Sequence, residues 1–305
     1  MFSFFLKKIV SLFKSEHNTV LRNDWKDTVP EDSNRSFKSR QWIFSSTAKK
    51  YAQQIAKGRY DHTLLEIYCD VIAEHLPAGS AILDAGAGTG ALSLKLSARG
   101  FAVTALDISD EMLSHIGDSD ARIRLKTGDL FELSQTQDTF EAIVSRWVVP
   151  HFSEWQSLVR GWAQIVKPGG YIMFDMPNRE HIERFSDALK FDLSRFIGYD
   201  HTIAPTEAGF YACASAEDLQ ELADSIDCDL VARRPHGLWK SNLDLANLLG
   251  GEAFQDFMGR LNTSPVDGEQ YAWIKLVETS AAIHLQADAV HGSLVVLRKR
   301  RAVNR

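Results

Sequence analysis

The segment Ala81-Ile82-Leu83-Asp84-Ala85-Gly86-Ala87-Gly88-Thr89-Gly90 decides the fold of this chain. A short apolar run leads directly into alternating glycines, and the residues after them, 91–98, are predicted to form a helix. Glycines let a ligand approach the backbone closely, and amides at the start of a helix can donate hydrogen bonds to it. We therefore expect a ligand-binding turn between a strand and a helix.

The glycine spacing and the neighbouring acid indicate which ligand this turn suits. The spacing is GxGxG, whereas the fingerprint of dinucleotide-binding turns is GxGxxG. The carboxylate of Asp84 would repel a pyrophosphate but suits the ammonium group and the sulfonium region of a cationic ligand. A turn that binds NAD or FAD remains the alternative.

Outward from the turn, short apolar runs alternate with amphipathic stretches. Strands are predicted at 81–83, 101–106, 123–127, 142–144, 171–174, 229–232 and 293–297, and helices at 61–76, 91–98 and 154–166. This alternation predicts an α/β fold, a Rossmann-like and mainly parallel sheet with helices on both faces. Segments of about 179–215 and 235–289 exceed ordinary strand connections, so we expect insertions that form a mostly helical cap over the ligand site.

Two further carboxylates follow the next two predicted strands. Asp107 stands about twenty residues beyond the first glycine, where an acidic side chain can accept hydrogen bonds from both hydroxyls of a ribose. Asp129 follows the third strand, where it can accept from the amino group of adenine while Leu130 packs on the ring. An isolated Asp at a strand end more often makes local turn hydrogen bonds. The series at these intervals favours a ligand that contains adenosine.

Over about a hundred residues the chain resembles the class I S-adenosylmethionine-dependent methyltransferases. The resemblance is carried, in that family's order, by 84–90, Asp107, Gly128-Asp129, the strand ending Val144-Ser145-Arg146, and Val166-Lys167-Pro168-Gly169-Gly170 before a strand. It implies a seven-stranded sheet whose last strand is antiparallel, with 229–232 and 293–297 as the final pair. It also implies S-adenosylmethionine as cofactor and methyl transfer as the reaction.

The resemblance implies roles for individual residues. Gly86 and Gly88 would line the methionine part of the cofactor, Asp107 would hold the ribose, and Ile108 would flank the adenine that Asp129 meets. Arg59 precedes the fold, where it could pair with the cofactor's carboxylate, although a surface arginine is equally favoured. The predicted cofactor-binding residues are Asp84, Gly86, Ala87, Gly88, Asp107, Ile108, Asp129, Leu130, Ser145 and Arg59.

Methyl transfer depends largely on alignment, and a general base is needed only where the acceptor must lose a proton. His151 is the candidate base, because it follows the fourth strand, where the carboxyl ends of the strands form the ligand crevice. A histidine that packs against the cap or caps the next helix is the favoured alternative. Four aromatic residues could stack on an acceptor, though such residues are more often core: Trp147, Trp155, Tyr211 and Trp239.

Motifs that the chain lacks narrow the choice of acceptor. No [DN]PP[YFW] follows the fourth strand, no CxxxCxxC is present, and no cluster suggests a metal. The net charge of -6 and the pI near 5.9 disfavour nucleic acid. We expect a small-molecule, lipid-linked or glycan acceptor methylated on oxygen or nitrogen, with oxygen slightly favoured. A non-catalytic protein that keeps the fold for binding or as a scaffold is the alternative.

The ends of the chain complete the predicted domain organisation. Residues 1–14 are predicted to form an amphipathic helix that suits weak contact with a membrane surface or docking against protein, while a transmembrane helix or signal peptide is not indicated. A polar linker at 15–41 and a helix at 46–57 follow, and 42–301 is the methyltransferase domain with its cap insertions. Three widely spaced cysteines fit a reducing setting, so a cytoplasmic protein is expected, with the inner face of a membrane as its possible contact.

Overall fold

Seven strands form one sheet in the computed structural model of the protein. The order across the sheet is β3-β2-β1-β4-β5-β9-β8, and β9 runs antiparallel to both of its neighbours while the other pairs are parallel. The bounds are β1 Ala81–Ala85, β2 Ala102–Asp107, β3 Ile123–Thr127, β4 Phe140–Ser145, β5 Val166–Pro177, β8 Cys228–His236 and β9 Gly292–Lys299. The predicted fold class is confirmed, including its antiparallel last strand.

The structure describes residues 59–116, 122–188, 203–206, 209–236, 253, 256, 260, 269–280 and 290–301. The predicted amphipathic helix at 1–14, the linker at 15–41 and the helix at 46–57 lie outside the described residues. Most of the predicted insertion at 235–289 lies outside them too, including Trp239.

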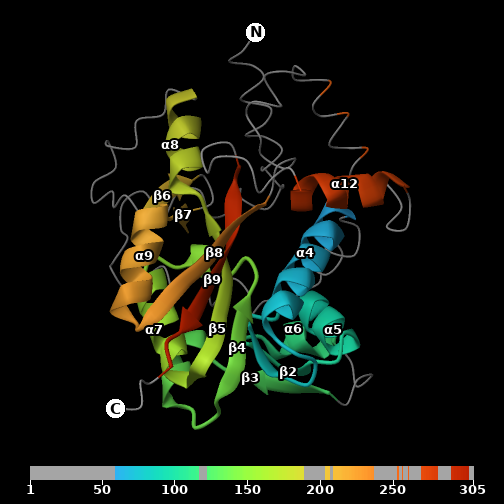
Figure 1. The fold of residues 1–305 in the computed structure, drawn as a ribbon, viewed down its shortest axis with the longest axis vertical. Coiled ribbons are helices and arrows are strands. Elements are labelled where there is room, and N and C mark those ends of the chain that lie inside the picture. Colours follow the sequence, from blue (N-terminus) through green and yellow to red (C-terminus); the bar gives the residue numbers. More distant parts are fainter. Residues whose placement is uncertain are drawn as a thin grey trace.

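Helices cover both faces of the sheet (Figure 1). One face carries α4 Arg59–His75 and α5 Ala91–Ala98, and the other carries α7 Trp155–Ile165 and α9 Ala216–Ser225. Short α6 Asp110–Ser114 packs beside β2. Because side chains alternate along a strand, Ile82 of β1 enters the core under α4 and α5, while Leu83 enters the core under α7. Both side chains are fully buried.

The Lys167–Gly170 turn predicted before the fifth strand lies inside β5. The pairing of β4 with β5 jumps from Phe140↔Val166 to Ala142↔Tyr171, so the residues between Val166 and Tyr171 depart from the regular ladder. Gly169 has φ +83°, a left-handed conformation that favours glycine. The predicted turn before the strand was therefore wrong: β5 begins at Val166, and 167–170 form an irregularity within it at which Gly169 takes the left-handed conformation.

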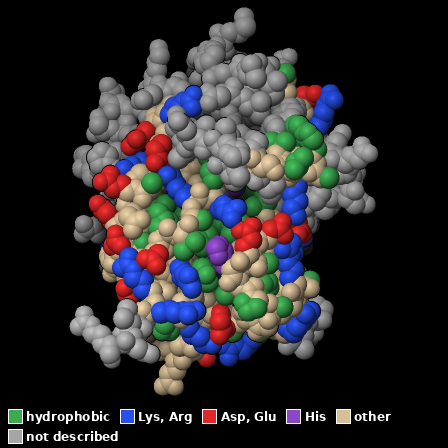
Figure 2. Space-filling model, in the orientation of Figure 1, with side chains coloured by type: hydrophobic (Ala, Val, Ile, Leu, Met, Phe, Trp, Pro, Cys, Tyr) green, Lys and Arg blue, Asp and Glu red, His purple; other side chains and the backbone are tan. Residues whose placement is uncertain are grey.

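The described parts of the two insertions contain helix and strand. The first holds α8 Arg179–Ala188 and a hairpin of β6 Ile203–Thr206 with β7 Gly209–Ala212, and the second holds α12 Glu269–Ser280, which contacts α4. That these segments cap the ligand site stays a prediction. Among the described helices, none combines the length and apolarity needed to cross a membrane. Acidic and basic side chains are interspersed over the described part of the face seen in Figure 2.

Candidate cofactor and acceptor site

The glycine turn joins β1 to α5 and fits closely between its neighbours. Gly86 and Gly90 both have φ +78°, and the amide of Gly86 donates to the carbonyl of Leu106 on β2 at 2.8 Å. A Cβ at Gly86 would lie 2.5 Å from Cγ2 of Val148, and one at Gly90 would collide with Ile116. Only glycine therefore fits at these two positions without a shift of the backbone or its neighbours.

Asp107, the last residue of β2, binds the turn through its carboxylate. Oδ2 accepts from the amide of Gly88 at 2.9 Å, and Oδ1 accepts from the amide of Ser109 at 3.0 Å. Burial raises the pKa of Asp107, and the backbone hydrogen bonds from Ser109 and Gly88 oppose that rise. The carboxylate thus fixes the glycine turn to the end of the neighbouring strand.

The predicted adenine contacts lie at the same edge of the sheet. Asp107 at the end of β2 pairs with Thr127 at the end of β3, and Asp129 lies two residues after Thr127 in the chain. Oδ1 of Asp129 accepts from the amide of Phe131 at 2.9 Å and caps the short helix η1 Leu130–Gln135. Ile108 and Leu130 are half-buried, as is Asp129. The structure brings these residues to one edge, and their contact with adenine stays a prediction.

Asp84 lies inside β1, beneath the turn, and is only 2% exposed. Its Oδ2 accepts from the hydroxyl of Ser93 on α5 at 2.6 Å. Burial raises the pKa of Asp84 to about 6, the hydrogen bond from Ser93 lowers it, and the charge of Asp107 raises it further. Asp84 is therefore a buried acid that changes protonation close to neutral pH, and the predicted contact with a cationic group stays a prediction.

The structure places the remaining predicted cofactor residues as follows. Ser145 ends β4 and is fully buried, and its hydroxyl donates to the carbonyl of Ala85 at 2.7 Å, which joins the ends of β4 and β1. Ala87 is half-buried in the turn, and its amide donates to Leu106 at 2.9 Å. Arg59 is the first residue of α4, and its side chain lies outside the described part of the structure.

The candidate base and the candidate stacking residues follow β4. His151 is half-buried and ends the short helix η2 Val149–His151, so it lies at the carboxyl edge of the sheet as predicted, but its role as base stays a prediction. Trp155 is fully buried, so it is a core residue and is not available to stack on an acceptor. Trp147 is half-buried with φ 55°, an uncommon value for a residue with a side chain. Tyr211 lies in β7, with its side chain outside the description.

The sequence analysis missed a buried acid and imidazole at this edge. Oδ1 of Asp175 on β5 lies 2.7 Å from Nε2 of His236 on β8, and Oδ2 accepts from the amide of Trp147 at 3.0 Å. Asp175 is 1% exposed and His236 is 2% exposed. Asp175 could have been noticed in the sequence, because a carboxylate directly after the apolar residues of a buried strand is unusual. No local pattern marks His236, because its partner lies 61 residues away in the sequence.

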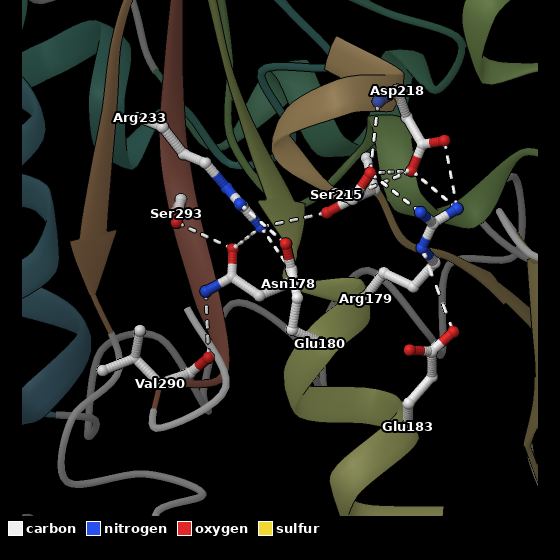
Figure 3. Close-up of polar contacts among 10 residues, drawn as sticks. Asn178, Arg179, Glu180, Glu183, Ser215, Asp218, Arg233, Val290 and Ser293 are labelled. Atoms are coloured by element: carbon white, nitrogen blue, oxygen red, sulfur yellow. Dashed lines mark hydrogen bonds and ion pairs between the residues drawn. The ribbon is translucent and has the colours of Figure 1, made fainter. Parts of the chain in front are cut away.

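Polar contacts fix the start of the first insertion to the sheet (Figure 3). Arg233 of β8 donates to Oδ1 of Asn178 at 2.7 Å and to Oε2 of Glu180 at 2.9 Å. Arg179 donates to the carboxylate of Asp218 and to the hydroxyl of Ser215, which caps α9. Burial alone would raise the pKa of Glu180, but the hydrogen bond and charge of Arg233 outweigh it and lower that pKa. These contacts therefore fix the start of the first insertion to β8 and α9.

Comparison with known proteins now decides the family. A family model described as a methyltransferase domain matches residues 60–233, more than half of the chain. The chain belongs to this family. The resemblance to class I S-adenosylmethionine-dependent methyltransferases is confirmed, and with it the prediction of S-adenosylmethionine as cofactor.

Two curated relatives of this methyltransferase match its central part. A malonyl-[acyl-carrier protein] O-methyltransferase of Erwinia pyrifoliae is 30% identical over 167 residues, covering 54% of this chain and 60% of the relative. A ubiquinone biosynthesis O-methyltransferase of Chromobacterium violaceum is 28% identical over 142 residues, covering 45% of this chain and 61% of the relative. The matches thus span less than two thirds of the length of either relative.

Solved structures similar to this methyltransferase share its fold. Magnesium protoporphyrin IX methyltransferase from Synechocystis PCC 6803, with bound SAH, has a TM-score of 0.53 at 11% identity and covers 87% of this chain and 99% of that chain. A Haemonchus contortus N-methyltransferase for phosphoethanolamine has a TM-score of 0.52 at 18% identity and covers 90% of this chain and 61% of that chain. At such identities the likeness shows the fold alone.

Proposed function

We propose that this protein transfers the methyl group of S-adenosylmethionine to an oxygen atom of a small acceptor, including lipid-linked or glycan acceptors. The observation that carries the cofactor half is the Asp107 carboxylate bound to the amide of Gly88, because it presents an acid beside the glycine turn. Support for oxygen as the acceptor atom comes from the two curated relatives, both of which are O-methyltransferases.

The described residues fit S-adenosylmethionine. The glycines of the turn have no side chains that would keep a ligand from the backbone, and Asp107 would offer carboxylate oxygens to the ribose hydroxyls. Asp129 would accept from the adenine amino group, and the buried carboxylate of Asp84 would offset the cofactor's ammonium group. When bound, the cofactor supplies a methyl group on a positively charged sulfur. The protein then contributes alignment of the acceptor and exclusion of water.

Calorimetry with S-adenosylhomocysteine tests the cofactor half. Asp107→Asn keeps the shape of the side chain but removes its charge and one acceptor oxygen. Hydrogen bonds to a charged group contribute roughly 1.5–3 kcal/mol each, so we expect binding about 10- to 100-fold weaker. Asp138→Asn is the matched control, because Asp138 is an exposed acid before β4 that pairs with Arg124. Absence of binding by the wild-type protein would refute the proposal.

A panel of acceptors tests whether the methyl group is transferred to oxygen. The wild-type protein is incubated with labelled S-adenosylmethionine and with 4-methylcatechol, a malonyl thioester of N-acetylcysteamine, or a primary alkylamine. We expect a methyl ether or a methyl ester as product. Methylation of the amine alone would contradict oxygen as the acceptor atom. Cofactor binding without turnover across a broader panel would instead support the non-catalytic scaffold alternative.

Contact of residues 1–14 with a membrane surface remains a separate proposal. Its support is the amphipathic pattern of Phe2, Phe5, Leu6, Ile9 and Leu12 opposite lysines. Flotation of full-length protein with anionic liposomes should exceed that of protein lacking Met1–Lys14. Equal flotation would exclude the segment as the anchor, and with it the expected location at the inner face of a membrane.

A further inference from the structure

We propose that His236, oriented by Asp175, is the residue that accepts the proton of a hydroxyl acceptor. This inference rests on the proposed O-methyl transfer and assigns the base to a residue other than His151. The imidazole reaches Asp175 across β9, its Nε2 lies against the carboxylate, and buried polar atoms beside the contact lack a partner among the described residues.

The imidazole of His236 reaches Asp175 by lying across β9. β9 separates β5 from β8, and His236 pairs with Gly292, while Gly292 also pairs with Pro177 of β5. A Cβ at Gly292 would lie 3.3 Å from Cε1 of His236, closer than an ordinary van der Waals contact. Glycine at this position therefore leaves the room through which the ring spans one strand and meets the carboxylate.

The hydrogen bonds of Asp175 determine the tautomer of His236. One oxygen accepts from the amide of Trp147 at 3.0 Å, and the other lies 2.7 Å from Nε2 of His236. An ionised carboxylate can only accept hydrogen bonds, so Nε2 must carry the hydrogen that it donates. In the neutral ring Nδ1 then holds a lone pair. This arrangement, a base oriented by a buried carboxylate, is the one that activates hydroxyl groups in other enzymes.

Two buried polar atoms near this pair have no hydrogen-bond partner among the described residues: Nδ1 of His236 and Oη of Tyr68. The ring of Tyr68, on α4, has its centroid 6.3 Å from that of His236 and is 1% exposed. Leaving a buried polar group without a partner destabilises a protein, so such groups are uncommon unless a ligand or a reaction uses them. An acceptor hydroxyl that donates to Nδ1 of His236 would give that atom its missing partner.

The pair lies where an acceptor must enter. His236 ends β8, which is parallel to β1–β5, so its side chain is at the carboxyl edge that also carries Asp107. Trp147, which follows β4 at that edge, makes an edge contact with His236, with ring centroids 5.9 Å apart. In open α/β sheets ligands bind outside the carboxyl ends of the strands. The predicted cofactor residues of the sheet lie at the carboxyl ends of β1 to β4, which leaves the half over β5 and β8 for the acceptor.

The proposed step is balanced in atoms and charge. The acceptor oxygen forms a bond to the methyl carbon as the carbon–sulfur bond breaks, and the electron pair of that bond stays on sulfur. The acceptor's proton passes to Nδ1 of His236. The carboxylate of Asp175 stabilises the resulting imidazolium, which later returns the proton to water.

Nitrogen NMR of histidine-labelled protein tests the tautomer without an acceptor. At the alkaline end of a pH series, where the imidazole is neutral, the signal of His236, assigned by its loss in His236→Gln, should show hydrogen on Nε2 and a lone pair on Nδ1. Asp175→Asn should abolish this preference, because the amide can also donate. Hydrogen on Nδ1 in the wild-type protein would overturn the proposal. This readout stands apart from the proposed function, which fails on its own if S-adenosylhomocysteine does not bind.

Kinetics with 4-methylcatechol and the malonyl thioester test the proton transfer. His236→Gln keeps an N–H that can donate to Asp175 but removes the basic nitrogen. We expect kcat for the catechol to fall about 10²- to 10⁴-fold, with KM and S-adenosylhomocysteine affinity little changed. The carboxylate probe has no proton to lose, so its kcat should be retained. Tyr68→Phe should raise KM for the catechol about 2- to 10-fold.

The matched control is His75→Gln. His75 lies in the last turn of α4 and contacts Tyr171 near the amino ends of the strands, with ring centroids 4.9 Å apart, so its substitution should leave turnover unchanged. Equal losses for both probes in His236→Gln would indicate a structural role and overturn the proposal. The proposal would also be overturned if His151→Gln lowered kcat for the catechol alone while His236→Gln did not lower it. Methylation of only the malonyl thioester by the wild-type protein would overturn it as well.

Discussion

Replacing Gly86 with alanine probes how the glycine turn is held. Gly86 has φ +78°, and an added Cβ would lie 2.5 Å from Cγ2 of Val148 and 3.1 Å from its Cγ1. The substitution therefore adds two costs, a left-handed backbone for a residue with a side chain and a collision with a neighbour. Because the turn is bound to Leu106 and Asp107, it cannot relax without losing those hydrogen bonds.

The two costs can be estimated separately. Alanine in the left-handed region costs roughly 1–2 kcal/mol. Overpacking by one methyl group costs typically about 1–3 kcal/mol. Gly86→Ala should therefore lower the free energy of unfolding by about 2–5 kcal/mol. Gly79→Ala is the matched control, because Gly79 has φ +86° and its added Cβ would meet nothing within 4 Å, so it carries the backbone cost alone.

Urea unfolding of the single variants, Val148→Ala and the double variant Gly86→Ala/Val148→Ala measures both costs. If the collision is real, the double variant should recover about 1–3 kcal/mol relative to the sum of the single changes. S-adenosylhomocysteine affinity should fall in Gly86→Ala and return in part in the double variant. Equal destabilisation by Gly79→Ala and Gly86→Ala, with additive behaviour of the double variant, would refute this account of the turn.

Two titrating groups give further predictions. Burial raises the pKa of Asp84 to about 6, so below that pH the unliganded protein holds a proton there, which must leave before the carboxylate can offset a ligand's ammonium group. Affinity for S-adenosylhomocysteine, measured by calorimetry between about pH 5 and 8, should therefore weaken as pH falls through about 6, by at most about tenfold per unit. Ser93→Ala removes a hydrogen bond that lowers this pKa and should move the midpoint to higher pH. Arg233 holds the pKa of Glu180 below its usual 4.5, so their interaction stabilises the fold above that pH and is lost as pH falls through the lowered value. Arg233→Met should lower the free energy of unfolding, measured with urea, by about 1–2 kcal/mol near pH 7; the figure is modest because Glu180 is partly exposed. At acidic pH, where Glu180 is protonated, the loss should be smaller. A loss that does not change with pH would contradict the ion pair.

Strands that contain an apolar pattern could be predicted from the sequence. Strand residues that are held only by pairing with a distant strand could not. The ranges 123–127 and 91–98 agree with β3 and α5 residue for residue. β8 was predicted at 229–232 but continues to His236, through Arg233, Arg234 and Pro235. These residues have no apolar pattern, and they are strand because they pair with β9, in part across a register shift between Leu230 and Ala232. A long-range partner decided what local periodicity could not.

The same distinction separates the two halves of the site. Asp84, Asp107 and the glycines could be found because the turn, the strand and the helix that use them are close in the sequence. Asp175 and His236 meet only because the sheet order places β5 and β8 on either side of β9. His236 also stands at the end of β8, in the part that apolar periodicity does not mark.

The place of β9 has a consequence for how the protein is made. Among the described strands β9 is translated last, yet it lies between β5 and β8. A growing chain that has emerged only through β8 carries two unpaired strand edges where β9 will insert, and such edges favour wrong pairings. The strands of the cofactor half, β1 to β4, can pair before that point. The contact of Asp175 with His236 across β9 forms only after this final insertion, so the proposed acceptor side is completed last.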